Sequence, residues 1–151
     1  MKQKEILLFG ATGQIGRNLI RRLSKDNYKI TAVTRNIHRA GYILKTQANP
    51  GYLDLVEISN LADEKIDLLM RKCSICINLI GILYEKKRDQ FKTIHTDFPD
   101  MLSQKANQYK LDKFIHMSSL GIEKAKDSKY AMSKLDGEKK IIKNFNKYII
   151  L

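Results

Sequence analysis

The chain of 151 residues has a mass of 17.5 kDa, enough for one ordinary domain. Its 43% hydrophobic and 29% charged residues exclude a wholly disordered chain, and no run approaches the roughly 20 apolar residues of a membrane-spanning helix. The net charge of +12 forms no basic tail, since residues 1–83 carry 13 basic and 7 acidic side chains and residues 84–151 carry 15 and 9.

Short apolar runs alternate with segments of helical periodicity along the chain. In chain order we predict a strand at Glu5–Phe9, a helix at Ile15–Lys25, a strand at Lys29–Thr34, a partly helical polar segment to Asn49, a strand at Tyr52–Ile58, a helix at Leu61–Arg71, a strand at Ile75–Ile80, a long helix at Asp89–Tyr109, a strand at Lys113–Met117, a helix at Lys129–Asn144 and a strand at Lys147–Leu151. Pro99 is expected to open or kink the second part of the long helix, because proline lacks a backbone N–H.

This alternation is typical of an α/β fold, in which right-handed crossovers place helices on both faces of a parallel sheet. Six strands connected in this way form two mononucleotide-binding halves with the strand order 3-2-1-4-5-6, a doubly wound Rossmann sheet. We expect residues 1–151 to form one such domain. Because the sequence stops inside an apolar strand, we also expect the fold to be truncated after strand six, with a carboxy-terminal substrate-binding region missing.

A glycine-rich turn, Gly10–Gly16 (GATGQIG), follows the first predicted strand and opens the first helix. A dinucleotide pyrophosphate needs bare backbone nearby and N–H groups aimed at it. Gly10 suits the sharp turn, Gly13 lets the phosphates approach, and Gly16 lets the helix pack tightly on the strand. We therefore predict a dinucleotide-binding loop, with a purely structural glycine turn as the alternative. Its contacting residues are Gly10, Thr12, Gly13, Gln14, Ile15 and Gly16.

The residue at the end of the second predicted strand favours one cofactor over the other. An acidic residue about 20 positions after the glycines would bind the ribose hydroxyls of NAD and repel a 2′-phosphate. The sequence instead has Arg35, followed by Asn36, and Arg39 lies one helical turn further on. A guanidinium can hold a phosphate with its planar fork. We predict NADP(H) as the cofactor, with NAD(H) less favoured, and a surface arginine without a ligand as the alternative.

The spacing GxxGxxG resembles the extended and atypical short-chain dehydrogenase/reductases, and a second signature supports the resemblance. The fifth predicted strand reads into Phe114–Gly121 (FIHMSSLG), and Tyr130 and Lys134 lie four residues apart on the next helix. The resemblance implies that Ser119 binds a substrate carbonyl, while Tyr130 and Lys134 carry proton chemistry and line the nicotinamide site. A spacing of four puts both side chains on one helix face. The pattern alone is unspecific, because it recurs at Tyr109–Lys113.

Two further segments, Ile77–Gly81 (INLIG) and Tyr130–Glu138 (YAMSKLDGE), are similar to one atypical branch of that family. This branch is the NADPH-binding accessory subunit of mitochondrial respiratory complex I and its bacterial relatives. The resemblance places Ile80 and Gly81 at the cofactor. It also places Ser59 and Asn60 near the adenine, where the family often has an aspartate.

Three functions remain open. The first is an NADP(H)-binding protein of the complex I branch, whose mitochondrial members are not expected to turn over substrate. The second is an active NAD(P)-dependent reductase or epimerase that uses Ser119, Tyr130 and Lys134, since this sequence retains the serine. The third is an RNA- or membrane-associated module that keeps the fold without the chemistry, which the net charge suggests.

Cysteines and histidines predict no metal site. Cys73 and Cys76 form a single CxxC, whereas a structural zinc site needs four ligands. The histidines at 38, 95 and 116 share no ligand spacing. We favour a structural role for the two cysteines, with a redox role as the alternative.

The partner and location follow from composition and resemblance together. The dinucleotide is the first expected partner, and respiratory complex I or a membrane-associated quinone-pathway assembly is the second. Nucleic acid is less favoured, because evenly spread lysines are typical of a solvated surface. Met1–Glu5 lead straight into a strand and not into an apolar signal segment. We expect a cytoplasmic protein, or one peripheral on the inner face of the cell membrane.

Overall fold

The fold is a six-stranded parallel α/β sheet with helices between the strands. The computed structural model describes residues 4–125 and 127–151. The strands are ordered β3-β2-β1-β4-β5-β6, which confirms the predicted doubly wound topology. The chain divides into two compact units, one reaching to Leu79 and the other running from Ile80 to Leu151.

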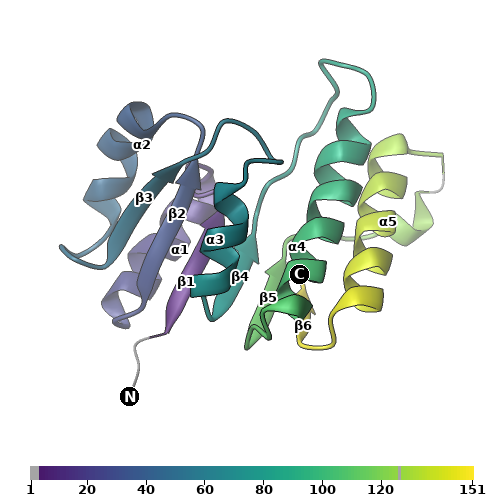
Figure 1. Cartoon of the computed structure of the whole chain (residues 1–151). Coiled ribbons are helices and arrows are strands. Elements are labelled where there is room, and N and C mark those ends of the chain that lie inside the picture. The colour runs from purple at the N-terminus through teal and green to yellow at the C-terminus, as the bar shows by residue number, and fades with distance from the viewer. Residues whose placement is uncertain (1–3, 126) are drawn as a thin grey trace. The chain divides into compact units, whose positions relative to one another are not determined.

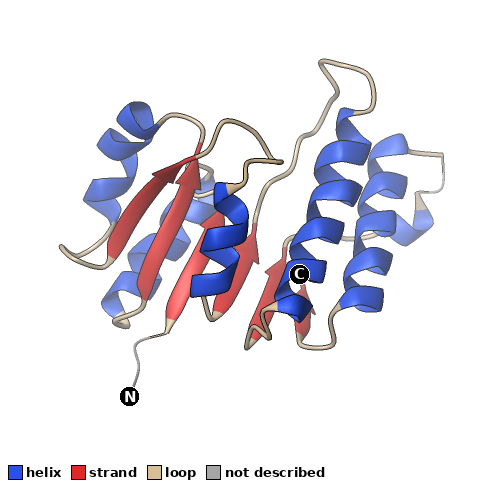
Figure 2. Cartoon of the chain, viewed as in Figure 1, coloured by secondary structure: helices blue, strands red, loops and turns tan. Residues whose placement is uncertain are grey.

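The observed elements follow the predicted order (Figures 1 and 2). The strands are β1 (Glu5–Phe9), β2 (Lys29–Thr34), β3 (Leu53–Glu57), β4 (Ile75–Asn78), β5 (Lys113–His116) and β6 (Tyr148–Ile150). The helices are α1 (Gln14–Lys25), α2 (Ile37–Leu44), α3 (Lys65–Lys72), α4 (Phe98–Gln108) and α5 (Lys129–Asn144). Short 3₁₀ turns η1 (Lys45–Gln47) and η3 (Ile122–Lys124) and a π-helical segment η2 (Lys92–Asp97) complete the set.

The first unit is built around β1, which is central and almost fully buried. It pairs with β2 on one side, Leu8 opposite Ala32, and with β4 on the other, Leu8 opposite Ile77. Figure 1 shows α3 in front of these strands and α1 behind them. Because both faces are covered, the strands are continuous apolar runs and do not alternate in polarity.

Helix α3 begins later than predicted. The periodicity suggested a start at Leu61, whereas the helix begins at Lys65. The Asp63 carboxylate accepts hydrogen bonds from the backbone N–H groups of Ser59 (2.8 Å) and Lys65 (3.0 Å). These side-chain bonds compete with helical ones, and aspartate typically ends a turn and starts a helix in this way.

The second unit packs α4 and α5 side by side next to β5 and β6 (Figure 2). The predicted long helix is continuous, but its first part, η2, has wide π-helical turns, and α4 begins at Phe98 with Pro99 in its first turn. Pro99 thus stands where the π-helical turns change to α4, the part of the helix that it was expected to open or kink. Asn144 Nδ2 on α5 donates to Asp100 Oδ1 on α4 (2.7 Å) and joins the two helices.

Helix α5 lies unusually close to η2 at Gly137. A Cβ on Gly137 would stand 1.9 Å from the carbonyl oxygen of His95 and 3.4 Å from Pro99 Cγ. Atoms cannot approach so closely, so only glycine permits this helix packing.

This packing predicts opposite effects for two helical glycines. Gly137→Ala should destabilise the protein by about 1–3 kcal/mol, because the added methyl would meet fixed backbone. Gly41→Ala in α2 is the matched control, since its Cβ would find only side-chain atoms at 3.9 Å. That change should gain about 0.5–1 kcal/mol from helix propensity. Urea unfolding measures both, and equal effects at the two positions would contradict the packing argument.

Candidate functional site

The glycine-rich turn has the geometry of a dinucleotide loop. Gly10 has φ of 81°, in the left-handed region, and its carbonyl accepts from Gly13 N–H (3.2 Å). A Cβ on Gly16 would stand 2.5 Å from Gly10 O and 2.7 Å from Ala11 Cα. Helix α1 therefore starts directly against the turn, as the sequence predicted.

The start of α1 leaves the backbone N–H groups of Gln14 and Ile15 for a ligand, whereas that of Gly13 donates to Gly10. Thr12, Gly13, Gln14 and Ile15 are exposed, and Gly13 is the N-cap without a side-chain cap. The first N–H groups of a helix have no intrahelical acceptor, and the first turn of α1 carries no acidic residue to occupy them. The residues present thus fit a pyrophosphate.

Arg35 follows the last residue of β2 and is exposed, as is Arg39. Within residues 4–125 and 127–151, neither guanidinium forms an ion pair. Asn36 has a different task, because its Oδ1 accepts from Arg39 N–H (2.9 Å) and caps α2. Glu57, at the end of β3, accepts from Ile37 N–H (2.6 Å). Its negative charge therefore lies at the backbone of Ile37, two residues beyond Arg35.

Ser59 and Asn60 form a turn that is held by Asp63. Besides its backbone bond, Ser59 donates its Oγ–H to Asp63 Oδ2 (3.0 Å), and Asn60 Nδ2 donates to Ser59 Oγ (3.1 Å). These hydrogen bonds, that from the Ser59 backbone first, lower the pKa of Asp63. The sequence analysis missed Asp63, which lies three residues past the predicted Asn60 and organises the loop that follows β3.

The two cysteines are free and poorly suited to thiol chemistry. Burial raises the pKa of Cys73 to about 12 and that of the fully buried Cys76 well above its usual range. The thiolate is the reactive form, so both thiols are suppressed as nucleophiles. Among the described residues, no group of three or more His, Cys, Asp and Glu side chains could hold a metal ion.

In the second unit, the predicted serine and tyrosine meet. Ser128 Oγ caps α5 by accepting from Ala131 N–H (3.2 Å), which places Tyr130 in the first turn. The hydroxyls of Ser119 and Tyr130 lie 2.7 Å apart. The neighbouring Ser118 is buried, and its Oγ has no hydrogen-bond partner within the described chain. Ser119 is thus the serine that meets Tyr130.

Lys134 lies one turn beyond Tyr130 and is only 5% exposed. Its Nζ donates to the carbonyl of Met117 (3.2 Å) and stands 5.7 Å from the centre of the Tyr130 ring. Burial lowers the pKa of Lys134, while Glu138 opposes the shift. Gly81 is beside it, because a Cβ on Gly81 would stand 3.6 Å from this Nζ. Ile80, the residue before Gly81, is half-buried.

His95 is the residue of this cluster that the sequence analysis missed. It belongs to η2, is 1% exposed, and its ring centre lies 5.3 Å from that of Tyr130. Burial first, and then the Lys134 charge, lowers the pKa of His95 to about 4. His116 on β5 is also buried, and its pKa is lowered to about 4 by burial and the same lysine. Both imidazoles are therefore neutral at pH 7.

Comparison with protein families identifies the class of the chain. Residues 10–148 match the model of the NAD(P)H-binding family, which covers most of the chain. The chain belongs to this family. It is an NAD(P)-binding Rossmann protein.

Individual relatives of the chain include subunits of respiratory NADH dehydrogenases. The 40 kDa subunit of mitochondrial NADH-ubiquinone oxidoreductase from Neurospora crassa is 27% identical over 131 residues, 87% of this chain and 35% of that protein. Subunit 9 of the NADH dehydrogenase [ubiquinone] 1 alpha subcomplex from Mus musculus is 26% identical over 144 residues, 95% of this chain and 38% of that protein. The chain spans little more than a third of the length of these relatives.

Solved structures of similar fold include nucleotide-sugar enzymes. A putative NAD-dependent epimerase/dehydratase from Bacillus halodurans has a TM-score of 0.83 at 19% identity, over 97% of this chain and 68% of that one. UDP-glucuronic acid 4-epimerase from Bacillus cereus, in complex with NAD, has a TM-score of 0.76 at 23% identity, over 97% and 54%. At such identities the likeness shows the fold alone. No helix of the described residues is long and apolar enough to cross a membrane.

The buried histidines predict a loss of stability in mild acid. Their pKa is about 4 in the folded chain and about 6.5 when unfolded, so below pH 6.5 the unfolded chain binds protons that the folded chain refuses. The histidine contribution to the free energy of unfolding is therefore fully present above pH 6.5. It falls towards pH 4, by about 1.4 kcal/mol per pH unit for each histidine. Urea unfolding between pH 7 and 5 measures the slope. His116→Gln should reduce it by about half, and an unchanged slope would contradict the assignment.

Proposed function

We propose that this chain binds NADP(H) in preference to NAD(H), as a relative of the respiratory NADH dehydrogenase subunits. One observation carries the cofactor choice: Arg35 and Arg39 are exposed, close in sequence, and free of ion pairs within the described residues. A 2′-phosphate would gain charge-assisted hydrogen bonds from such guanidinium groups. The Glu57 carboxylate nearby reduces the gain and does not cancel two positive charges.

The Gly10–Gly16 turn and the start of α1 would hold the pyrophosphate on backbone N–H groups. Gly81, Tyr130 and Lys134 would line the nicotinamide end. The chain spans little more than a third of the length of these relatives, and we take residues 1–151 as one nucleotide-binding domain.

A catalytic role is the second candidate, and the 2.7 Å contact between Ser119 and Tyr130 favours it. Ser119 would donate a hydrogen bond to a substrate carbonyl, and Tyr130 would move the proton at its hydroxyl. Lys134 would keep a positive charge beside the Tyr130 ring. The bound nicotinamide supplies hydride transfer.

The names of the relatives also suggest a partner and a place. We propose that the chain associates with a respiratory NADH dehydrogenase or a membrane-associated quinone-pathway assembly. It would do so from the cytoplasm, peripheral on the inner face of the membrane. Co-purification of the native protein with membranes, and its release by salt, would support this location.

Arg35 gives the sharpest test of cofactor choice. A charge-assisted contact of about 1.5–3 kcal/mol corresponds to a roughly tenfold to hundredfold preference for NADPH, and exposure favours the lower value. Arg35→Asp should reverse the preference, and high salt should weaken it. Thermal shift with NADPH and NADH measures the difference. Lys45→Asp is the charge-matched control. Equal shifts with both cofactors in the unmodified protein would refute the role of Arg35.

Tyr130→Phe separates an enzyme from a binding protein. The change removes only the hydroxyl that contacts Ser119, so cofactor affinity should change less than about threefold while any reductase turnover falls by about 10²–10⁴. Tyr109→Phe, in the other YxxxK pattern, is the control. Turnover that survives Tyr130→Phe would exclude the proton-transfer role.

A further inference from the structure

His95 is tied to its surroundings by a one-directional chain of hydrogen bonds. Ile82 N–H donates to His95 Nε2 (3.1 Å), so this nitrogen carries a lone pair and the ring proton is on Nδ1. Nδ1 lies 2.9 Å from Ser133 Oγ, and Ser133 donates its own proton to the carbonyl of Tyr130 (2.7 Å). Every donor thus has one acceptor, from the loop after β4 to the first turn of α5.

The ring faces are as closely held as the nitrogens. Phe91 stacks on His95 at 5.4 Å between ring centres and 20° between planes. Tyr130 meets the His95 ring edge-on, at 88°, and Phe91 at 75°. Such aromatic contacts fix ring orientation, because offset-stacked and edge-on pairs are preferred over other geometries. His95 therefore packs against the Tyr130 side chain and is also linked, through Ser133, to the Tyr130 carbonyl.

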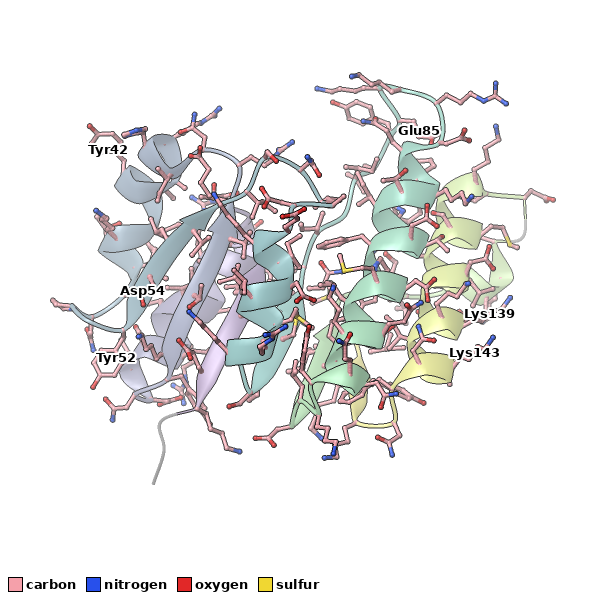
Figure 3. All side chains as sticks on the ribbon, viewed as in Figure 1. Tyr42, Tyr52, Asp54, Glu85, Lys139 and Lys143 are labelled. Atoms are coloured by element: carbon pink, nitrogen blue, oxygen red, sulfur yellow. The ribbon has the colours of Figure 1, made fainter. Side chains whose placement is uncertain are left out.

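The backbone at His95 cannot shift to relax these contacts. Gly137 packs directly on the His95 carbonyl, and Thr96 Oγ1 donates to the carbonyl of Ser133 (2.8 Å). On the loop side, Phe91 N–H donates to Glu85 Oε1 (2.8 Å), and Figure 3 shows Glu85 beside the beginning of this helical region. A π-helical segment inside a helix is often found at functional sites.

These observations lead to one inference. We propose that His95 is the positioning residue of the Ser119–Tyr130–Lys134 cluster, joining the Gly81–Ile82 backbone to α5 and fixing Tyr130 against Ser119. The inference rests on the proposed role of that cluster at the nicotinamide end of the cofactor. Among the described residues, no hydrogen bond joins His95 to the Ser119 or Tyr130 hydroxyl, so His95 acts through Ser133 and through its ring contact with Tyr130.

The charges that face His95 favour this role. Lys134 on α5 disfavours its protonation, and Glu85 on the preceding loop favours it; His95 in turn disfavours protonation of His116 on β5. The lysine and burial prevail, since the pKa of His95 falls to about 4. Protonation would remove the lone pair that Ile82 N–H needs, so the chain of hydrogen bonds stays intact at neutral pH.

Two ligands test the inference in the full chain. NADPH contains the nicotinamide, whereas 2′-phospho-ADP-ribose contains only the part that the glycine-rich turn and Arg35 would bind. His95→Phe keeps an aromatic ring of similar size and removes both hydrogen bonds. We expect it to weaken NADPH binding about tenfold, or about 1.4 kcal/mol, and to leave 2′-phospho-ADP-ribose within twofold, both measured by calorimetry. Equal weakening of both ligands, or no weakening of NADPH, would overturn the proposal.

The control and a second variant separate positioning from stability. Ile141→Val removes one buried methyl from the same helix and should lower the stability without changing either affinity. Ser133→Ala breaks the same chain at its next link. The double variant should therefore lose less NADPH affinity than the sum of the losses in Ser133→Ala and His95→Phe. Full additivity would mean that the two residues act separately.

A measurement without ligand keeps the inference distinct from the proposed function. In protein with ¹³C-labelled tyrosine, Tyr130→Phe assigns the Tyr130 ring signals. These signals should move in His95→Phe and stay in place in Ile141→Val. If the unmodified protein binds neither ligand while the Tyr130 signals move, the proposed function fails and the positioning role stands. If the signals do not move in His95→Phe, the positioning role fails whatever the protein binds.

Discussion

Backbone contact without an intervening Cβ is the constraint on which both units depend. In the first unit Gly16 brings α1 against the carbonyl of Gly10, and in the second Gly137 brings α5 against the carbonyl of His95. Side chains at these positions would force the elements apart, because close-packed interiors have no spare volume. The first contact places the helix N-terminus over the turn. The second places the Tyr130 face of α5 over His95.

Of the buried basic groups Lys134, His95 and His116 in the second unit, only Lys134 is protonated at pH 7. Burial disfavours all three charges, and the Lys134 charge further lowers the pKa of His95 and of His116. The lysine has the highest intrinsic pKa, so it keeps its proton and the imidazoles lose theirs. A neutral His95 then has one donor and one acceptor nitrogen, which its two partners require. Burial and the lysine charge thus keep His95 neutral, and its hydrogen-bond partners select the tautomer.

Most of the fold could be predicted because strands buried on both faces of a parallel sheet can be recognised as apolar runs in the sequence. Runs such as Glu5–Phe9 are apolar throughout, and helix α5 was predicted with its exact bounds, since Ser128 is a strong N-cap. Two features of the fold could not be predicted from the sequence. The late start of α3 depends on where the Asp63 carboxylate points, and the π-helical turns of η2 have no distinct periodicity in the sequence.

The glycine turn and the Tyr130–Lys134 pair were recognisable because their partners lie within a few residues or in a known motif. His95 was not, because its partners Ile82 and Ser133 lie 13 and 38 residues away. Ser133 shows that residues between the defining positions of such a motif also contribute to the site. It stands inside the stretch from Tyr130 to Lys134, and its hydroxyl turns a local pattern into a link with η2. A short motif therefore specifies which groups meet, while the residues between its letters decide how firmly they are held.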